Sequence, residues 1–219
     1  MIRAASKRQF ALVAGLLVVA LIATLPLRLA LAAMPGVAAR EAQGPVWWGT
    51  VRDLRIGPAQ AGNAAVGLEP LPLLIGRMQV WLRRDGASGT LRARLGTDDG
   101  RLRVVEADGM VPVPEGIGPV PVRELGFTDF AVRMADDGCV RAGGAVRATV
   151  AGPDAAPLML SGTARCERGR VVVPMQSAGG VERLVLKVDA RGRWDAVLTL
   201  MADPSRPEGA AAFRADGRF

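Results

Sequence analysis

The sequence of 219 residues predicts a mainly β protein, in which a single N-terminal transmembrane helix precedes a curled antiparallel β-meander domain. Three observations predict this fold class. An uncharged apolar segment, Phe10–Leu27, lies near the N-terminus, apolar and polar residues then alternate repeatedly, and Gly or Asp-Gly separates the alternating runs. A sheet with one apolar face must curl or pack on itself to cover that face.

The apolar segment predicts a membrane anchor over residues 10–33. Eighteen helical residues at about 1.5 Å each approach the roughly 30 Å thickness of a hydrocarbon core. Basic side chains precede this segment at Arg3, Lys7 and Arg8. By the positive-inside rule, residues 1–9 then lie in the cytoplasm and the rest of the chain lies beyond the membrane.

A cleaved signal peptide is the alternative interpretation of the N-terminus, because Ala30–Met34 offers an A-x-A cleavage site. The apolar run exceeds the about 7–15 residues typical of a signal-peptide core, which favours a retained helix. Both interpretations place the remaining chain in the same compartment. We expect a linker at 34–43, a β domain at 44–203 and a C-terminal tail at 204–219.

The distribution of charge argues against a nucleic-acid partner. The net charge is +7, but residues 1–40 hold five basic side chains and no acid, which leaves 23 basic and 21 acidic residues in 41–219. A nearly neutral domain does not predict a surface that follows phosphates.

We expect the two cysteines, Cys139 and Cys166, to form a disulfide, because both lie outside the membrane, where disulfides persist. Closure of this loop would stabilise the fold by about 3.5 kcal/mol in the chain-entropy model. Without any histidine or C-x-x-C motif, the sequence predicts no metal site.

Alternation marks ten candidate runs, from which we expect about nine strands in the domain. The runs Arg77–Arg84 and Thr90–Gly96 flank a Gly-containing turn and predict a hairpin, as do Glu182–Asp189 and Trp194–Met201. The other candidate strands are Val46–Ile56, Leu102–Glu106, Phe127–Ala135, Val140–Val150, Leu158–Cys166 and Arg170–Met175.

Two segments interrupt this pattern. Gly109–Gly126 contains four prolines, which lack a backbone donor, so we expect an extended edge or loop there, with a partner-docking strand as the sharper alternative. Beyond Asp203 the chain has the composition of a mobile tail or a loose final strand.

No residue pattern predicts catalysis. The absence of histidine excludes a Ser-His-Asp mechanism, and the chain has no phosphate-binding loop. Asp98-Asp99 and Asp136-Asp137 each precede a glycine, which favours hairpin turns over paired catalytic carboxylates. We therefore expect no cofactor and no small-molecule substrate. A solvated face, rather than an anion-binding groove, is expected for the arginines at Arg92, Arg94, Arg101 and Arg103.

The segment Gly44–Arg77 resembles protein N of the bacterial type II secretion system, a family with one inner-membrane helix and a periplasmic domain. The resemblance consists of four elements in order, V-W-x-G, L-x-x-G, L-x-P and L-L-x-G-R. The matching residues are Val46, Trp47 and Gly49, then Leu54 and Gly57, then Leu68 and Pro70, and finally Leu73, Leu74, Gly76 and Arg77. Val66 departs from the pattern, since an aromatic residue is expected two positions before Leu68.

This resemblance implies an accessory inner-membrane component without catalysis, which assists assembly or stability of the platform that exports folded proteins across the outer membrane. The implied partners are other inner-membrane components of that system and inner-membrane lipid. A carrier that holds lipid tails along an apolar sheet face is the first alternative, and a hydrolase with two converging carboxylates is the second. Because adjacent strand residues face opposite ways, we expect Trp47 to pack inward and Trp48 to face outward or toward the membrane.

Overall fold

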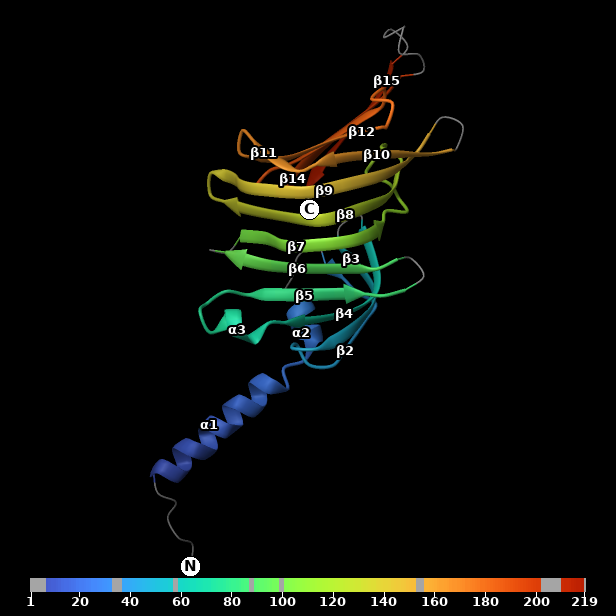
Figure 1. Cartoon of the computed structure of the whole chain (residues 1–219). Coiled ribbons are helices and arrows are strands. Elements are labelled where there is room, and N and C mark those ends of the chain that lie inside the picture. Colours follow the sequence, from blue (N-terminus) through green and yellow to red (C-terminus); the bar gives the residue numbers. More distant parts are fainter. Residues whose placement is uncertain are drawn as a thin grey trace, which may run out of the picture.

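The computed structural model describes residues 7–32, 37–56, 59–86, 89–98, 101–152, 156–201 and 210–218. Within them, fifteen strands form one continuous antiparallel sheet (Figure 1). In chain order these are β1 (Val37–Ala38), β2 (Glu41–Gln43), β3 (Gly49–Ile56), β4 (Ala59–Leu68), β5 (Gln79–Arg84), β6 (Leu91–Asp98), β7 (Arg101–Pro112), β8 (Val122–Ala135), β9 (Gly138–Ala151), β10 (Pro157–Thr163), β11 (Arg165–Glu167), β12 (Arg170–Gln176), β13 (Arg183–Val188), β14 (Arg193–Met201) and β15 (Ala210–Arg218).

The predicted meander is confirmed, because the strands follow one another across the sheet almost entirely in chain order. Both predicted hairpins are present, as β5 with β6 and as β13 with β14. Two short strands branch from the main path, since β2 joins β3 beside β1, and β11 pairs with β12. The predicted strand Leu158–Cys166 is divided between β10 and β11 at Ala164, whose N–H donates to the carbonyl of Gly144 at 3.0 Å.

The sheet curls so that its early strands lie behind its middle strands (Figure 1). Arg84, at the end of β5, stabilises the curled sheet through hydrogen bonds in the protein interior. Its buried side chain donates Nη1 to the carbonyl of Ala61 on β4 at 3.3 Å and Nη2 to the carbonyl of Met110 on β7. One guanidinium thus bonds two strands that are not neighbours in the sheet order.

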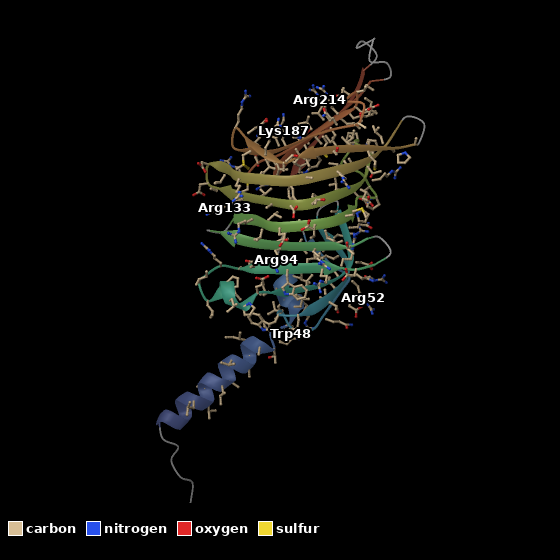
Figure 2. The ribbon with its side chains drawn as sticks, viewed as in Figure 1. Trp48, Arg52, Arg94, Arg133, Lys187 and Arg214 are labelled. Carbon is tan, nitrogen blue, oxygen red and sulfur yellow. A yellow bond between two sulfur atoms is a disulfide. The ribbon has the colours of Figure 1, made fainter. Side chains whose placement is uncertain are left out.

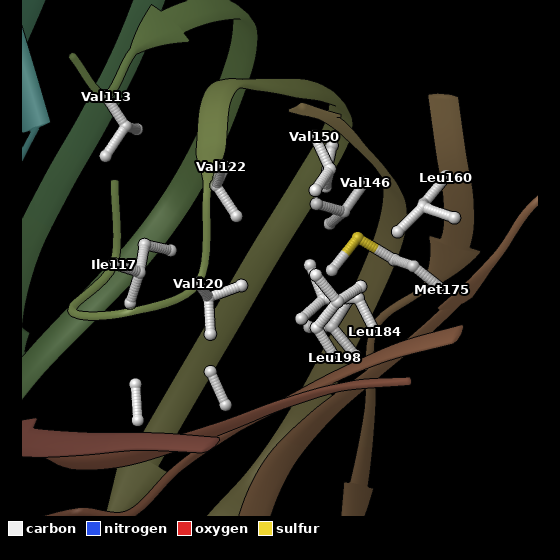
Figure 3. Close-up of a cluster of buried hydrophobic side chains, with 14 of the residues drawn as sticks. Val113, Ile117, Val120, Val122, Val146, Val150, Leu160, Met175, Leu184 and Leu198 are labelled. Carbon is white, nitrogen blue, oxygen red and sulfur yellow. The ribbon is translucent and has the colours of Figure 1, made fainter. Parts of the chain in front are cut away.

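The buried apolar side chains of the described residues gather at two places inside the curl. An N-terminal cluster contains Leu27, Val51, Leu54, Ala61, Ala64, Val66, Leu82, Leu91 and Val111. The larger C-terminal cluster takes side chains from β8 to β15 and from the loop after β7 (Figure 3). Phe127 packs against both clusters, so the two halves share one continuous interior.

The Pro-rich segment Gly109–Gly126 differs from one of the two forms expected for it. The edge-strand interpretation is wrong, because β7 and β8 are central strands that extend into this segment from either side. The loop interpretation is right for residues 113–121, part of which turns inward while Pro114, Glu115, Gly118 and Pro119 stay exposed. Ile117 and Val120 form an isolated bridge, and both side chains are buried in the C-terminal cluster (Figure 3).

Four strands were not predicted as regular elements, and two of them, β1 and β2, are short and lie in the predicted linker 34–43. β4 has four alanines and two glycines in ten residues, so it lacks the β-branched alternation that marks a strand, although Ala61, Ala64 and Val66 are buried. β15 pairs with β14 along its whole length, which matches the final-strand interpretation of the C-terminus for residues 210–218.

The predicted helical segment at 10–33 is divided in the structure. α1 (Lys7–Ala23) and α2 (Leu27–Ala32) are separated at Pro26, whose ring disfavours helical geometry at Leu25. Leu27 of α2 belongs to the N-terminal cluster, so this second helix is part of the domain core. Among the described residues, no helix combines the length and the apolar character needed to cross a membrane.

Candidate functional site at the helix–domain junction

Five of the eleven motif residues predicted from the sequence lie where α1 meets the β domain, a region that we call the junction. There the linker Leu25–Leu27 runs antiparallel to the segment Gly44–Val46. The N–H of Val46 donates to the carbonyl of Leu25 at 2.7 Å, and the N–H of Leu27 donates to the carbonyl of Gly44 at 3.1 Å. The exit of α1 is therefore paired, backbone to backbone, with the start of the V-W-x-G motif.

The two adjacent tryptophans have different environments at this junction. Trp47 is half-buried, and its indole Nε1 donates to the carbonyl of Ile22 at 3.0 Å. Ile22 lies in the last turn of α1, where carbonyl groups have no partner within the helix. Trp48 is 67% exposed and lies at the end of the domain next to α1 (Figure 2). The structure thus agrees with the prediction that the pair divides between an inward and an outward side chain.

Two glycines permit the close approach of these segments. A Cβ atom on Gly49 would lie 2.6 Å from the carbonyl oxygen of Gln43 and 2.6 Å from the Leu27 side chain. A Cβ atom on Gly67 would lie 2.0 Å from the carbonyl oxygen of Trp47. Neither position accepts a side chain without movement of the backbone, because carbon and oxygen atoms do not approach so closely.

Hydrogen bonds and apolar packing complete the junction. The N–H of Leu68 on β4 donates to the carbonyl of Val46 at 2.9 Å, which attaches the motif segment to the sheet. Val46 and Leu54 are almost completely buried, and Leu54 shares the N-terminal cluster with Leu27. The motif residues of the first two elements therefore connect α1, α2 and the sheet. Gly57 lies outside the described residues.

The last motif elements form a projecting turn between β4 and β5. This segment, residues 70–77, begins with the short helix α3 (Pro70–Leu73), and we call it the apolar turn. Gly76 closes it with φ +73°, a left-handed conformation that glycine adopts without a steric cost. At the base of the turn, the N–H of Glu69 donates to the carbonyl of Gln79 at 2.8 Å.

The disulfide lies in the other half of the protein. Cys139 of β9 is bonded to Cys166 of β11, with their Cα atoms 5.5 Å apart. The N–H of Cys139 also donates to the carbonyl of Gly169 at 2.8 Å, so the bridge joins segments that already contact each other. The disulfide was predicted because both cysteines lie on the same side of the predicted membrane segment. The fold shows how it forms, since β9 and β11 lie next to each other.

Of the charged residues considered in the sequence analysis, Arg92 and Arg94 are exposed as expected, whereas Arg103 is only partly exposed and its Nε atom is buried. Arg94 on β6 is within 3.4 Å of Glu69 and 3.6 Å of Glu106, which confirms for this residue an arginine balanced by neighbouring acids. Asp136 and Asp137 form the exposed turn between β8 and β9, as predicted from the glycine that follows them. Asp98 ends β6, and Asp99 lies outside the described residues.

Sequence reasoning alone did not find Gly67, Leu27 or Ile22 as members of the junction. Gly67 belongs to none of the motif elements, and its role depends on the carbonyl of Trp47, twenty residues earlier in the chain. Leu27 belonged to the predicted membrane segment. Pro26 was the one local signal, because a proline near the end of an apolar helix marks a possible break.

The fold and the junction define a structural protein whose all-β domain is joined by hydrogen bonds to an exposed apolar helix. A family model places it more closely. The model for type II secretion system protein N matches residues 35–213, which include the junction motifs and nearly the whole sheet. The chain belongs to this family of structural secretion components, which are associated with the cell envelope and are not enzymes. No curated protein and no solved structure matches the chain.

Proposed function

We propose that this protein is an accessory inner-membrane component of the type II secretion system, which assists assembly or stability of the platform that exports folded proteins across the outer membrane. The family match over residues 35–213 is the observation that carries this proposal. The other inner-membrane components of the platform are the partners. The protein contributes contacts and position rather than chemistry.

In this proposal α1 lies in the inner membrane, with the N-terminus in the cytoplasm and the β domain in the periplasm. Seven large apolar side chains between Leu12 and Ile22 are 52–69% exposed and occupy all sides of the helix. A helix that is apolar all round suits an apolar surrounding. Its 17 residues correspond to about 25 Å and stand at the lower limit of about 17–25 residues for a spanning helix.

The junction supports a positioning role. If α1 were connected by a flexible linker, the domain would sample many orientations above the membrane. Here the linker is paired with Gly44–Val46, and Trp47 bonds the last turn of α1. A partner that binds the domain would therefore meet it at a restricted height and orientation. Preorganisation of this kind lowers the entropic cost of assembly.

The disulfide also supports a periplasmic location for the domain, because such bonds persist in that compartment and are rare in the cytoplasm. The lipid-carrier alternative gains no comparable support. The apolar interior of the C-terminal half is filled by the protein's own side chains, and Ile117 and Val120 from the inward loop are among them (Figure 3).

Crosslinking in native membranes, followed by gentle detergent extraction, affinity capture and mass spectrometry, tests the proposal. We expect platform components to be recovered with the full chain. Recovery of lipid alone, with no platform component above background, would contradict the assembly role and favour the carrier.

A further inference from the structure

The apolar turn exposes a concentration of large side chains that the junction does not use. Leu71, Leu74 and Ile75 are 77%, 82% and 67% exposed, and they lie within five consecutive residues. The other large apolar side chains exposed on the sheet, such as Met159, Val140 and Phe213, stand on separate strands. Single exposed apolar residues are ordinary, whereas a cluster of them marks a contact surface.

The turn lies at the end of the domain from which α1 projects. Figure 1 shows α3 beside β4 and β5, at the same end as α2 and the C-terminus of α1. Trp48 is exposed at this end as well (Figure 2), and Leu29 of α2 is exposed in the same part of the chain. An apolar environment around the C-terminal end of α1 would therefore also be close to the apolar turn.

The backbone of the turn suits an apolar medium. Pro70 and Pro72 have no N–H group, and the N–H groups of the four residues from Leu74 to Arg77 donate to carbonyls inside the turn. Six of its eight residues thus present no backbone donor that needs water. A segment with this property enters a bilayer at lower cost than an ordinary loop, because unsatisfied donors are expensive in hydrocarbon.

Charge is placed at the foot of the turn rather than at its tip. Arg77, exposed, follows the three apolar side chains, and Arg28 is exposed on α2. Glu69, which precedes the turn, is balanced by Arg94. Apolar side chains at a tip, with exposed basic residues behind them, match the order of acyl chains and anionic phosphates at a membrane surface.

We propose that the apolar turn is a second membrane contact, which inserts Leu71, Leu74 and Ile75 into the interfacial layer of the bilayer that holds α1. This inference rests on the proposed membrane anchoring of α1. The occupant of the surface is lipid, with acyl chains around the three side chains and anionic headgroups near Arg77. The junction fixes the domain relative to α1, and a second contact on the same membrane would also limit the tilt of α1 and the domain together.

The test uses the full chain, reconstituted by itself into vesicles of phosphatidylethanolamine and phosphatidylglycerol. Three variants, Leu74→Cys, Met159→Cys and Leu16→Cys, each carry one NBD fluorophore, and lipids with a doxyl group on the acyl chain act as the quencher. Position 159 is the matched control, because Met159 is 72% exposed but lies on β10, far along the sheet from the turn. Position 16 reports on α1. Since these side chains are exposed, the substitutions leave the core unchanged.

We expect several-fold stronger quenching and blue-shifted emission at position 74 compared with position 159, together with strong quenching at position 16. Quenching at position 16 with none at position 74 would overturn the second contact and leave the anchor intact. The absence of quenching at both positions would instead overturn the anchor on which the inference rests. If position 74 is unquenched in vesicles but crosslinks to a platform component in native membranes, the turn docks on protein and the lipid assignment is wrong.

Discussion

The substitution Gly67→Ala tests whether close backbone contact at the junction determines stability. The added Cβ would lie 2.0 Å from the carbonyl oxygen of Trp47, so the two segments must separate by about 1 Å to reach an ordinary contact. Such movement breaks the 2.9 Å hydrogen bond from Leu68 to Val46. The lost bond is worth about 0.5–1.5 kcal/mol, and overpacking adds about 1–3 kcal/mol. We expect a loss of about 2–4 kcal/mol in the free energy of unfolding.

Urea unfolding of the full chain in mild detergent, followed by tryptophan fluorescence, measures this loss. For a slope of about 2 kcal/mol per molar urea, the midpoint should fall by about 1–2 M. Gly143→Ala is the matched control, because a Cβ at that position of β9 meets no atom within 4 Å. Its effect should stay within about 0.5 kcal/mol. Equal midpoints for the two variants would refute the argument that Gly67 is required by the approach of Trp47.

Three further changes test other contacts by the same urea assay. Trp47→Phe keeps an aromatic ring but removes the hydrogen-bond donor to the end of α1, so the free energy of unfolding should fall by about 1 kcal/mol. Protease cleavage near Pro26 should also become faster, and an unchanged cleavage rate would contradict a role for this bond. Cys139→Ser with Cys166→Ser should cost about 3–4 kcal/mol, and a midpoint equal to that of the oxidised protein would contradict the chain-entropy argument. Arg84→Met removes the donor to the carbonyls of Ala61 and Met110 and should lower the free energy of unfolding by about 1–3 kcal/mol. An unchanged midpoint would contradict this role and would mean that water replaces the guanidinium.

The sequence predicted those strands whose stability depends on alternating side chains. The hairpins β5–β6 and β13–β14 follow directly from Leu, Val and Ala at every second position. β4 was missed because it consists largely of alanine and glycine, which show no alternation of apolar and polar side chains. These small residues are present because they let the backbone of the junction approach the strand. For residues 113–121 the loop was predicted but its inward direction was not. Proline indicates that backbone N–H donors are missing, but it does not indicate which way a loop folds.

The candidate site was predicted as a list of motif residues, without its arrangement. The order of the four elements indicated the family. The disulfide could be proposed because the chain has only two cysteines and both lie beyond the predicted membrane segment. The contact of Trp47 with Ile22 joins residues twenty-five positions apart through a side-chain donor, and no local pattern encodes it. Gly67 illustrates the same limit, because an unfavourable residue in isolation is the required one when another backbone lies where its side chain would be.

The arrangement of the junction gives these motif residues a shared physical role. Val46, Trp47 and Gly49 connect the β domain to α1 and α2, while Leu74 and Gly76 form the turn that projects from the same end. The disulfide and the larger buried cluster lie in the other half, where they stabilise the sheet without touching α1. The protein is therefore divided between an end that fixes the domain relative to its helix and a half that keeps the sheet folded. In the proposed function, changes to exposed side chains at the first end, such as Leu74, are expected to impair export without loss of folding. Changes to buried residues in either half should instead lower the amount of folded protein.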